Sequence, residues 1–410
     1  MNPLFPLVIL LLVLLSGALV YCILAIAAAR QYLSVRSPAP VHTPPISLLR
    51  PLHGSDEDTE ENLRRCFTQE YSEFEILAGV RQLDDPAAAV FERVCAEFPA
   101  GPAARLIVTG APYNPNAKAH SLERLIANAR YDVLVMADSD VRPRPGMLRV
   151  LAAEFQDPSV GVVTCPYRAV AGHSIWSRLE CIGMNTEFLA GVLVARMVDG
   201  MKFALGPVIA ARRDVIDRVG GFQQLGEFLA EDFVLGHRAA EQGDRVLLSS
   251  CVIEHRIGSQ PFGVNMRHRL RWARSTRRSR PAGYWGQVFT NPLPLAFLLC
   301  MVDHRAWPLL VLTAAFRALA AWSTASQVLS SSLSAVDWLL LPIQDFLSFC
   351  LWTAGFFGDE IWWGGKQYRL QDDGRFELVT PTHAFAEAAQ PKANPAVFAP
   401  RPHSVRPFGD

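Results

Sequence analysis

The chain has 410 residues, of which 50% are hydrophobic and 19% charged, a more apolar balance than most soluble proteins show. Its 39 basic and 39 acidic residues give a net charge of zero, which argues against a nucleic-acid-binding protein, because such a protein presents a basic field. The eight cysteines show no CxxC pair and no zinc-type spacing. They indicate reduced, mostly buried thiols in a cytoplasmic domain.

The first apolar run extends from Leu4 to Ala29 without a charged residue, which is long enough to cross a bilayer core. A cleaved signal peptide is the competing interpretation, because AIAAA resembles a cleavage site. However, no basic region precedes the run, and it is about twice as long as a signal-peptide core. Arg30 and Arg36 follow, and the positive-inside rule places the next segment in the cytoplasm. We therefore expect a transmembrane anchor at 1–36 and a proline-rich linker at 37–45.

Strand and helix patterns alternate after the linker. Short apolar runs predict strands at Ile46–Arg50, Phe74–Val80, Ala104–Gly110 and Tyr131–Ala137. Polar-faced segments between these runs predict helices at 57–71, 85–98 and 121–130. This rhythm is typical of βαβ units, so we expect an α/β domain with a mostly parallel sheet over residues 46–286.

Acidic residues follow two of the predicted strands. Asp84 and Asp85 come after the second strand, and Asp138 and Asp140 come after the fourth, in the sequence ADSD. Ligands of open α/β sheets bind beyond the carboxyl ends of the strands, where these side chains would lie. Each aspartate can also cap a helix or close a turn. With two acidic loops on the same edge, a site for a hard cation becomes as good an interpretation as two unrelated turns.

Two later segments carry charged residues of interest. Glu231 and Asp232 open an amphipathic helix, where they either complement the helix dipole or belong to a site. Arginines crowd the stretch from Arg267 to Arg280, which includes Arg271 and Trp272. That stretch is either a basic helix facing lipid headgroups or a site for a phosphate-bearing substrate.

The order of these motifs, followed by apolar segments, resembles the family 2 and family 21 glycosyltransferases, and most closely the ceramide glucosyltransferases. That likeness covers nearly the whole chain and implies the GT-A fold. The family signature of three aspartate motifs and (Q/R)xxRW falls on Asp85, Asp138, Asp232 and Arg271-Trp272. NPNAKAHSL resembles a further family segment and places its lysine at Lys118. His268 departs from the family pattern at the first position of (Q/R)xxRW, which leaves the acceptor open.

For the donor, the resemblance implies a UDP-sugar whose diphosphate is bound through Mg2+ or Mn2+. Asp138 belongs to this metal site, and Asp140 is either a second metal ligand or a turn residue. Asp85 is expected to hold the nucleoside, and Lys118 to reach the uracil or the diphosphate.

For the acceptor, inversion requires a general base that takes a proton from the attacking hydroxyl group. We expect Asp232 to be this base rather than Glu231, since adjacent helix residues point about 100° apart. Arg271 is expected to bind phosphate, and Trp272 a sugar or lipid. His268 is placed in the same substrate-binding motif.

The resemblance thus implies an inverting hexosyltransferase that makes glucosylceramide from UDP-glucose and ceramide at a lipid bilayer. A hopanoid or another lipid acceptor, or UDP-N-acetylglucosamine as donor, is the alternative. A non-catalytic membrane scaffold of the same fold is the alternative of a different class, but all three aspartate positions are filled. The expected setting is a bacterial inner membrane, with several crossings and a cytoplasmic catalytic domain.

Three apolar segments follow the domain, at Val288–Val302, Trp307–Ser326 and Val336–Phe357, within an expected membrane region at 287–363. Three crossings would put the following WWGGKQYRL outside, although its basic residues favour the cytoplasmic face. We therefore expect one segment to be re-entrant or interfacial, either in the proline-broken first or in the second half of the third. The tail at 364–410 is expected to be largely disordered, since from about Asp372 onward it is rich in proline and lacks apolar periodicity.

Overall fold

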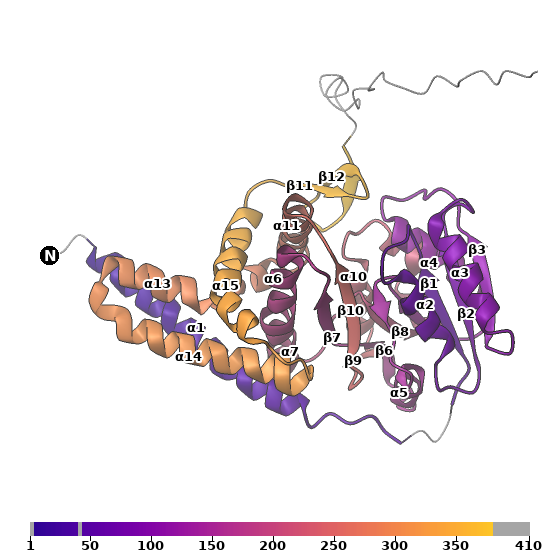
Figure 1. The fold of residues 1–410 in the computed structure, drawn as a ribbon, viewed down its shortest axis with the longest axis horizontal. Helices are drawn as coiled ribbons and strands as arrows, with labels where there is room; N and C mark the ends of the chain where they lie inside the picture. Colours follow the sequence, from indigo (N-terminus) through magenta and orange to yellow (C-terminus); the bar gives the residue numbers. More distant parts are fainter. Residues whose placement is uncertain (1–3, 40–42, 380–410) are drawn as a thin grey trace, which may run out of the picture.

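The computed structural model describes residues 4–39 and 43–379. Figure 1 shows an α/β domain, a bundle of helices that projects from one side of it, and a small sheet near the C-terminal end of the described chain. All eight cysteines are free thiols, and five of them are buried, as the spacing predicted.

The central sheet has seven strands in the order β3-β2-β1-β4-β8-β6-β9. β3, β2, β1 and β4 are parallel, β8 is antiparallel to both of its neighbours, and β6 and β9 are parallel. The strands are β1 (Ile46–Pro51), β2 (Phe74–Val80), β3 (Ala103–Val108), β4 (Val133–Ala137), β6 (Val160–Thr164), β8 (Val208–Arg212) and β9 (Arg245–Leu248). The predicted mixed α/β fold with a mostly parallel sheet is confirmed, and all four predicted strands are present.

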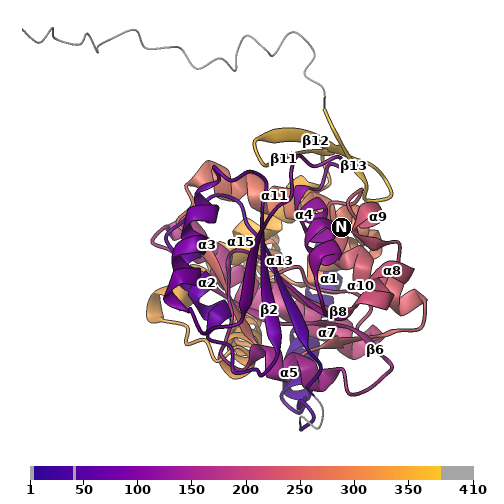
Figure 2. The same cartoon turned by 90° about the vertical axis from the view of Figure 1, so that its right-hand side faces the viewer.

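Both faces of this sheet are covered, which explains the continuous apolar runs in its strands. Successive residues of a strand point to opposite faces, so Leu48 packs with α2 (Thr59–Phe67) and α3 (Pro86–Glu97), and Leu49 packs with α4 (Ala117–Asn128). Figure 2 shows α2 and α3 on one side of the strands and α4 on the other. The two apolar cores fix the strand ends at which the acidic loops begin.

A smaller sheet continues beyond the end of β4. It consists of β5 (Val141–Arg142), β10 (Ile253–Gly258) and β7 (Tyr167–Ala171), in the order β5-β10-β7. The remaining helices of the domain are α5 (Met147–Glu154), α8 (Arg213–Arg218), α9 (Gly221–Leu225) and α10 (Glu231–Glu241). Because β10 pairs with β5, residues near 255 are brought beside the loop that follows β4.

A layer of helices lies between the α/β domain and the projecting bundle (Figure 1). It contains α6 (Ile175–Gly183), the π-helix η1 (Met184–Phe188) and α7 (Leu189–Asp199), which follow one another without a break. It also contains α11 (Phe262–Ser279) and α15 (Ala335–Gly355), and α15 packs on both α6 and α11. This layer separates the acidic loops from the bundle.

The projecting bundle consists of α1 (Phe5–Tyr32), α13 (Pro292–Val302) and α14 (Trp307–Trp322). Its core is formed by Leu11, Leu15, Ala18, Leu295, Ala296 and Leu299. By length and composition, four helices of the described chain could span a membrane, or five if the bent pair Pro281–Phe289 and Pro292–Val302 counts as one span. Short helices join these parts: α12 (Pro281–Gly286), η2 (Gln287–Phe289), η3 (His304–Ala306) and η4 (Ser323–Val328).

The first part of the tail is ordered. β11 (Glu360–Trp363), β12 (Lys366–Leu370) and β13 (Phe376–Leu378) form an antiparallel sheet. Gly364 and Gly365 make the tight turn of the hairpin, both with a positive φ that glycine adopts readily. Alternate apolar side chains of this sheet bury against Leu229, a tertiary contact that composition does not reveal. Residues 380–410 lie outside the described residues.

Candidate active site

Asp138 and Asp140 lie in the loop between β4 and β5. The backbone N–H of Asp138 donates to Pro207 O at 3.0 Å, and the N–H of Val141 donates to Asp138 O at 3.1 Å. These bonds close the turn with backbone groups alone, so neither carboxylate is needed to satisfy it. Both side chains are therefore available for other partners at the edge of the sheet.

Lys118 joins the acidic loop to α10. Its Nζ lies 2.6 Å from Asp138 Oδ1 and 3.3 Å from Glu231 Oε1, and it donates to Gly206 O at 3.4 Å. Burial opposes the charge on Lys118, but the carboxylates of Asp138, Glu231 and Asp232 raise its pKa above its ordinary value. Burial raises the pKa of Asp138 to about 6, against the opposing effect of Lys118. Lys118 is thus engaged with carboxylates when no substrate is bound.

Asp140 pairs with a histidine that the sequence did not single out. Its Oδ2 lies 3.0 Å from Nε2 of His255, which β10 places beside the loop. Burial alone would raise the pKa of Asp140, but the imidazole of His255 holds it below its ordinary value. Burial also opposes the charge on His255, yet Asp140 raises the pKa of that imidazole. The second carboxylate oxygen, Asp140 Oδ1, is buried without a hydrogen-bond partner among the described residues.

The acidic loop fits a divalent cation that takes only part of its coordination from protein. No group of three or more His, Cys, Asp or Glu side chains in the described chain is arranged to hold a metal alone. Asp140 Oδ1 is an unpartnered buried carboxylate oxygen, and the Lys118 contact engages only one oxygen of Asp138. Mg2+ and Mn2+ accept such sites, because they use one or two carboxylates and fill the other positions with water and phosphate.

The first turn of α10 separates the roles of its two acidic residues. Glu231 is buried, and its Oε2 accepts a hydrogen bond from Asn116 Nδ2 at 2.9 Å while its Oε1 faces Lys118. Asp232 Oδ2 instead lies against Gly206, where an added Cβ would come within 2.9 Å of it and within 3.8 Å of Lys118 Nζ. Burial, followed by the charge of Glu231, raises the pKa of Asp232 to about 7. Asp232 is therefore poised to gain or lose a proton near neutral pH.

Arg271 presents a guanidinium without an anionic partner. The group lies 5.6 Å from the ring centroid of Trp363 in β11, a cation–π contact, and within the described chain no ion pair or hydrogen bond engages it. Burial lowers the pKa of Arg271 to about 10, against the effects of Glu231 and Glu180, so the group remains charged at neutral pH. A charged, half-buried guanidinium whose N–H groups are free to donate hydrogen bonds is suited to binding a diphosphate.

His268 and Trp272 form a second face of α11. The two rings lie 4.4 Å apart, and His268 Nδ1 lies 3.2 Å from Glu180 Oε1 on α6. Glu180 is almost fully buried and also accepts a hydrogen bond from Asn265 Nδ2. His268, which replaces the Gln or Arg of the family motif, is therefore held toward α6 by the buried carboxylate of Glu180.

Asp85 has the capping role that aspartates at strand ends often take. It is the N-cap of α3, where its Oδ1 accepts from Ala87 N and from Gly54 N, each at 2.9 Å. Its Oδ2 lies 3.3 Å from His53 Nδ1. Asp85 thus fixes the loop after β1 to the start of α3, and this contact leaves its expected role toward the nucleoside to be tested.

The structure therefore gathers most of the predicted residues and adds three that the motifs did not include. Lys118 and Asp232 both lie beside Gly206, Lys118 also pairs with Asp138, and Asp140 lies in the same loop as Asp138. The additional residues are His255, Glu231 as a buried partner, and Glu180. A histidine inside the alternating strand IEHRIG was the available signal for His255, but a strand alone does not show which loop it meets.

The sequence is similar to known proteins along most of its length. The sequence model of glycosyl transferase family 21 matches residues 9–376. Ceramide glucosyltransferase 1 of Caenorhabditis elegans is 25% identical over 209 residues, which are 50% of this chain and 44% of that protein. Ceramide glucosyltransferase 3 of the same organism is 24% identical over 208 residues, 50% of this chain and 45% of that protein. The match thus covers less than half the length of these relatives.

Among solved structures, a mannosyltransferase from Pyrobaculum calidifontis in complex with GDP-Man and Mn2+ is similar in fold. The TM-score is 0.53 at 18% sequence identity, and the likeness covers 86% of this chain and 99% of that one. This supports a GT-A-like glycosyltransferase fold and no more than the fold. Because the family match extends over nearly the whole chain, including most of α1, the site, β11 and β12, the chain belongs to glycosyl transferase family 21.

Proposed function

We propose that this chain transfers glucose from UDP-glucose to the hydroxyl group of ceramide, with inversion at the anomeric carbon. The observation that carries the proposal is the meeting of three charged groups: Lys118 lies beside Gly206 together with Asp232, and it forms an ion pair with Asp138. The unpartnered guanidinium of Arg271, beside a layer of apolar helices, supports it further. The site thus combines carboxylates for a metal, a carboxylate of raised pKa and a cation near helices able to enter a membrane.

For the donor, we propose that Asp138 and Asp140 hold Mg2+ or Mn2+. When bound, this ion would neutralise charge on the diphosphate of the sugar donor. Lys118 keeps its charge between Asp138 and Glu231 and is placed to turn toward a phosphate once the site is filled. Arg271 is proposed to bind the same diphosphate through its free N–H groups. Asp85, by holding the loop after β1, is proposed to shape the nucleoside site.

For the acceptor, Asp232 is proposed to take the proton of the attacking hydroxyl group. The oxygen then forms its bond to the anomeric carbon while the bond to the diphosphate breaks, and UDP leaves. Inversion follows from this single displacement. Glu231 is a poor candidate for the base, because both its oxygens already face Asn116 and Lys118. His268 and Trp272 are proposed to contact the acceptor, since they line α11 on the side of α6.

The proposed division of the chain follows the expected one. Residues 46–286 form the catalytic domain, 1–36 a membrane anchor, 37–45 a linker, and 287–363 further helices at the membrane. β11–β13 add a small sheet that packs on the catalytic domain, and the tail begins after it. Arg30 and Arg36 after α1 support a cytoplasmic catalytic domain, as in a bacterial inner membrane protein.

The second candidate keeps the chemistry and changes the lipid or the sugar. His268 stands where the family motif has Gln or Arg, and it pairs with the buried Glu180 rather than standing free. An altered acceptor contact favours a hopanoid or another lipid acceptor, with UDP-glucose or UDP-N-acetylglucosamine as donor.

The experiment that separates these candidates is lipid mass spectrometry of a host that expresses the chain. A parallel panel of radiolabelled UDP-sugars and purified lipids identifies donor and acceptor one at a time. A hexosylceramide product supports the first proposal, and a glycosylated hopanoid supports the second. Release of a long polysaccharide, or transfer to no lipid in either assay, contradicts both.

Substitution Asp140→Asn tests the metal site. We expect the Mn2+ concentration that gives half-maximal activity to rise about 10-fold or more, because one anionic ligand is lost while Asp138 remains. UDP-dependent binding of Mn2+, measured by electron paramagnetic resonance, should weaken in parallel. The matched control is Asp214→Asn, an exposed aspartate on α8. Unchanged Mn2+ affinity in the Asp140 variant would show that the carboxylate pairs with His255 and does not bind the metal.

A further inference from the structure

α15 has the length and composition of a membrane span but a different direction from the bundle. Its 21 residues extend about 32 Å at 1.5 Å per residue, enough to cross a bilayer core. Figure 1 shows that α1, α13 and α14 run alongside one another, whereas α15 runs across their direction, next to α6 and α11. A helix that lies across the base of a membrane-spanning bundle is not aligned with the bundle, and it therefore does not span the same bilayer.

Both ends of α15 are attached to the α/β domain. Before the helix, Val328 and Leu329 pack into the main core of the domain, and Arg168 on β7 donates to Ser330 O at 3.4 Å. After the helix, Arg277 on α11 donates to the carbonyl groups of Phe356 and Gly358. A crossing helix would place its two ends on opposite sides of the bilayer. These contacts place both ends on one side.

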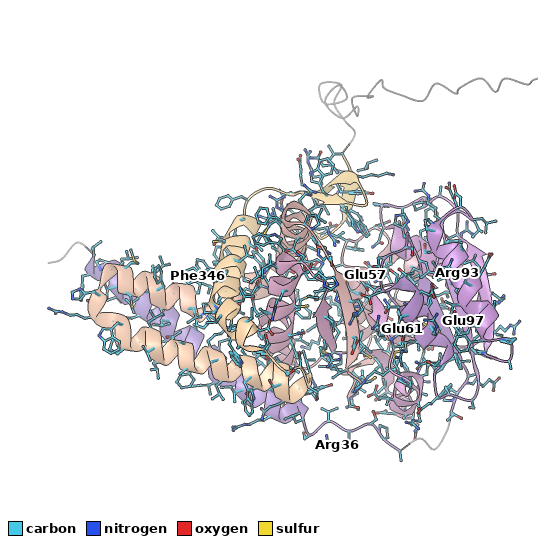
Figure 3. The ribbon with its side chains drawn as sticks, in the orientation of Figure 1. Arg36, Glu57, Glu61, Arg93, Glu97 and Phe346 are labelled. Carbon is cyan, nitrogen blue, oxygen red and sulfur yellow. The ribbon has the colours of Figure 1, made fainter. Side chains whose placement is uncertain are left out.

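The outward face of α15 is a continuous apolar stripe. Exposed residues recur every three or four positions at Val336, Leu339, Ile343, Phe346 and Cys350, and Leu339 is 75% exposed. This is the spacing of one face of an α-helix. Figure 3 labels Phe346 on the side of α15 toward α13, and its ring lies 5.4 Å from that of Phe297. The stripe therefore continues the apolar surface of the bundle.

The opposite face of α15 is polar and faces the protein. Its polar side chains bond to arginines on three different helices: Asp337 with Arg178, Asp345 with Arg317, and Ser348 with Arg269. Gln344 is fully buried on the same face. A helix at the boundary between water and hydrocarbon has this asymmetry.

Exposed aromatic residues lie near the C-terminal end of α15 in the chain or in space. Trp285, Phe357 and Trp362 are exposed, and Trp285 packs on Phe356. Aromatic rings gather at the headgroup level of membrane proteins, where one edge is wet and the other apolar. Continuity with the bundle and this aromatic cluster identify a lipid bilayer, rather than another protein, as the occupant of the stripe.

We propose that α15 lies in the boundary between headgroups and acyl chains, on the side of the bilayer that holds the α/β domain. The apolar stripe enters the acyl region, and the polar face closes the catalytic domain from the membrane. Crossing of the bilayer is then left to α1, α14 and the bent pair Pro281–Phe289 and Pro292–Val302, and β11–β13 stay on the side of the catalytic domain. This proposal concerns topology and holds whichever sugar and lipid the site uses.

The test measures how deep spin labels lie in the bilayer, at two positions eleven residues apart on each of two helices. Single nitroxide labels are placed on cysteines at Leu339→Cys or native Cys350 on α15, and at Val311→Cys or Trp322→Cys on α14, in a full-length chain whose other partly exposed cysteines are serine. All four positions are exposed on the helix surface, so labelling leaves the packing intact. Depth in nanodiscs is read from relaxation by oxygen and by a water-soluble nickel complex.

We expect the α14 pair to differ in depth by about 16 Å, the rise of eleven helical residues. The α15 pair should differ by less than half of the value measured for α14. A difference for α15 of half that value or more overturns the proposal, as does a position for either α15 label in bulk water. Since no catalytic step enters the measurement, failure here leaves the proposed glucosyl transfer untouched, and failure of transfer leaves the topology untouched.

Discussion

Replacing Asp232 by asparagine is expected to lower kcat by about 10²- to 10⁴-fold, the usual contribution of a positioned general base. Asparagine keeps the size of the side chain beside Gly206 but cannot accept the acceptor proton. Binding of UDP and Mn2+ should persist, because Lys118 and Asp138 remain. The measurement is transfer of radiolabelled sugar to lipid by the purified variant. Asp214→Asn on α8 is the control and should match the wild type.

The pH dependence of the rate is a second test of Asp232 as the general base. Burial raises its pKa to about 7, and a base is active only when it has lost its proton. The rate of the wild type should therefore fall as the pH drops below about 7, and rise to a plateau above it. The residual activity of Asp232→Asn should lack this acidic limb. Near-normal product formation by the variant, with the limb intact, would remove Asp232 from the role of base.

Replacing Arg271 by alanine is expected to lower kcat by about 10²- to 10³-fold, comparable to the loss of one preorganised donor at a developing charge. The guanidinium is charged, half-buried and free of other anionic partners in the described chain, so the proposed diphosphate would be its only counter-charge. Arg271→Lys should recover part of the rate, since lysine restores the charge but not the planar fork or the stacking on Trp363. Steady-state kinetics with varied UDP-sugar measure both effects.

Arg267→Ala is the matched control for Arg271, because Arg267 lies one turn earlier on α11 and is exposed. It should retain wild-type kinetics. An equal loss of activity in the Arg267 and Arg271 variants would point to a general effect of the basic helix, such as weaker attachment to lipid headgroups. Unchanged kinetics in Arg271→Ala would contradict a role at the diphosphate.

The sequence predicted the sheet well because its central strands are buried on both faces. Runs such as that around Leu48 and Leu49 must be apolar throughout, so they stand out without knowledge of their neighbours. The acidic loops could be assigned to one edge because parallel strands end together. Asp138 and Asp232 could be found in this way, since each lies at the end or start of a regular element.

The partners of these residues could not be predicted in the same way, because they arise from tertiary pairing. His255 reaches Asp140 only because β10 pairs with β5, and Glu180 reaches His268 only because α6 packs on α11. The order of the segment around Tyr368 could not be predicted either, because it depends on burial against Leu229. Composition alone also could not show whether α15 spans the bilayer or lies along its surface.

The ion pair between Arg317 on α14 and Asp345 on α15 bears on how the protein is assembled during synthesis. Both side chains are fully buried, and the guanidinium also donates to Thr186 Oγ1 at 3.0 Å. Asp345 follows Arg317 by 28 positions, so α14 leaves the ribosome before its partner exists. An unpaired arginine in an inserting helix costs up to about 2.5 to 3.5 kcal/mol, the value at the helix centre.

The hairpin formed by α13 and α14 is therefore not sufficient for membrane insertion until α15 has been synthesised and has docked on it. A chain truncated after Ser334 is expected to leave α14 largely outside the bilayer, with its protection from added protease reduced several-fold. Arg317→Leu in the same truncated chain should restore protection, and equal protection of the truncated and full-length chains would contradict this. During biogenesis, docking of α15 would thus complete the insertion of α13 and α14 into the membrane.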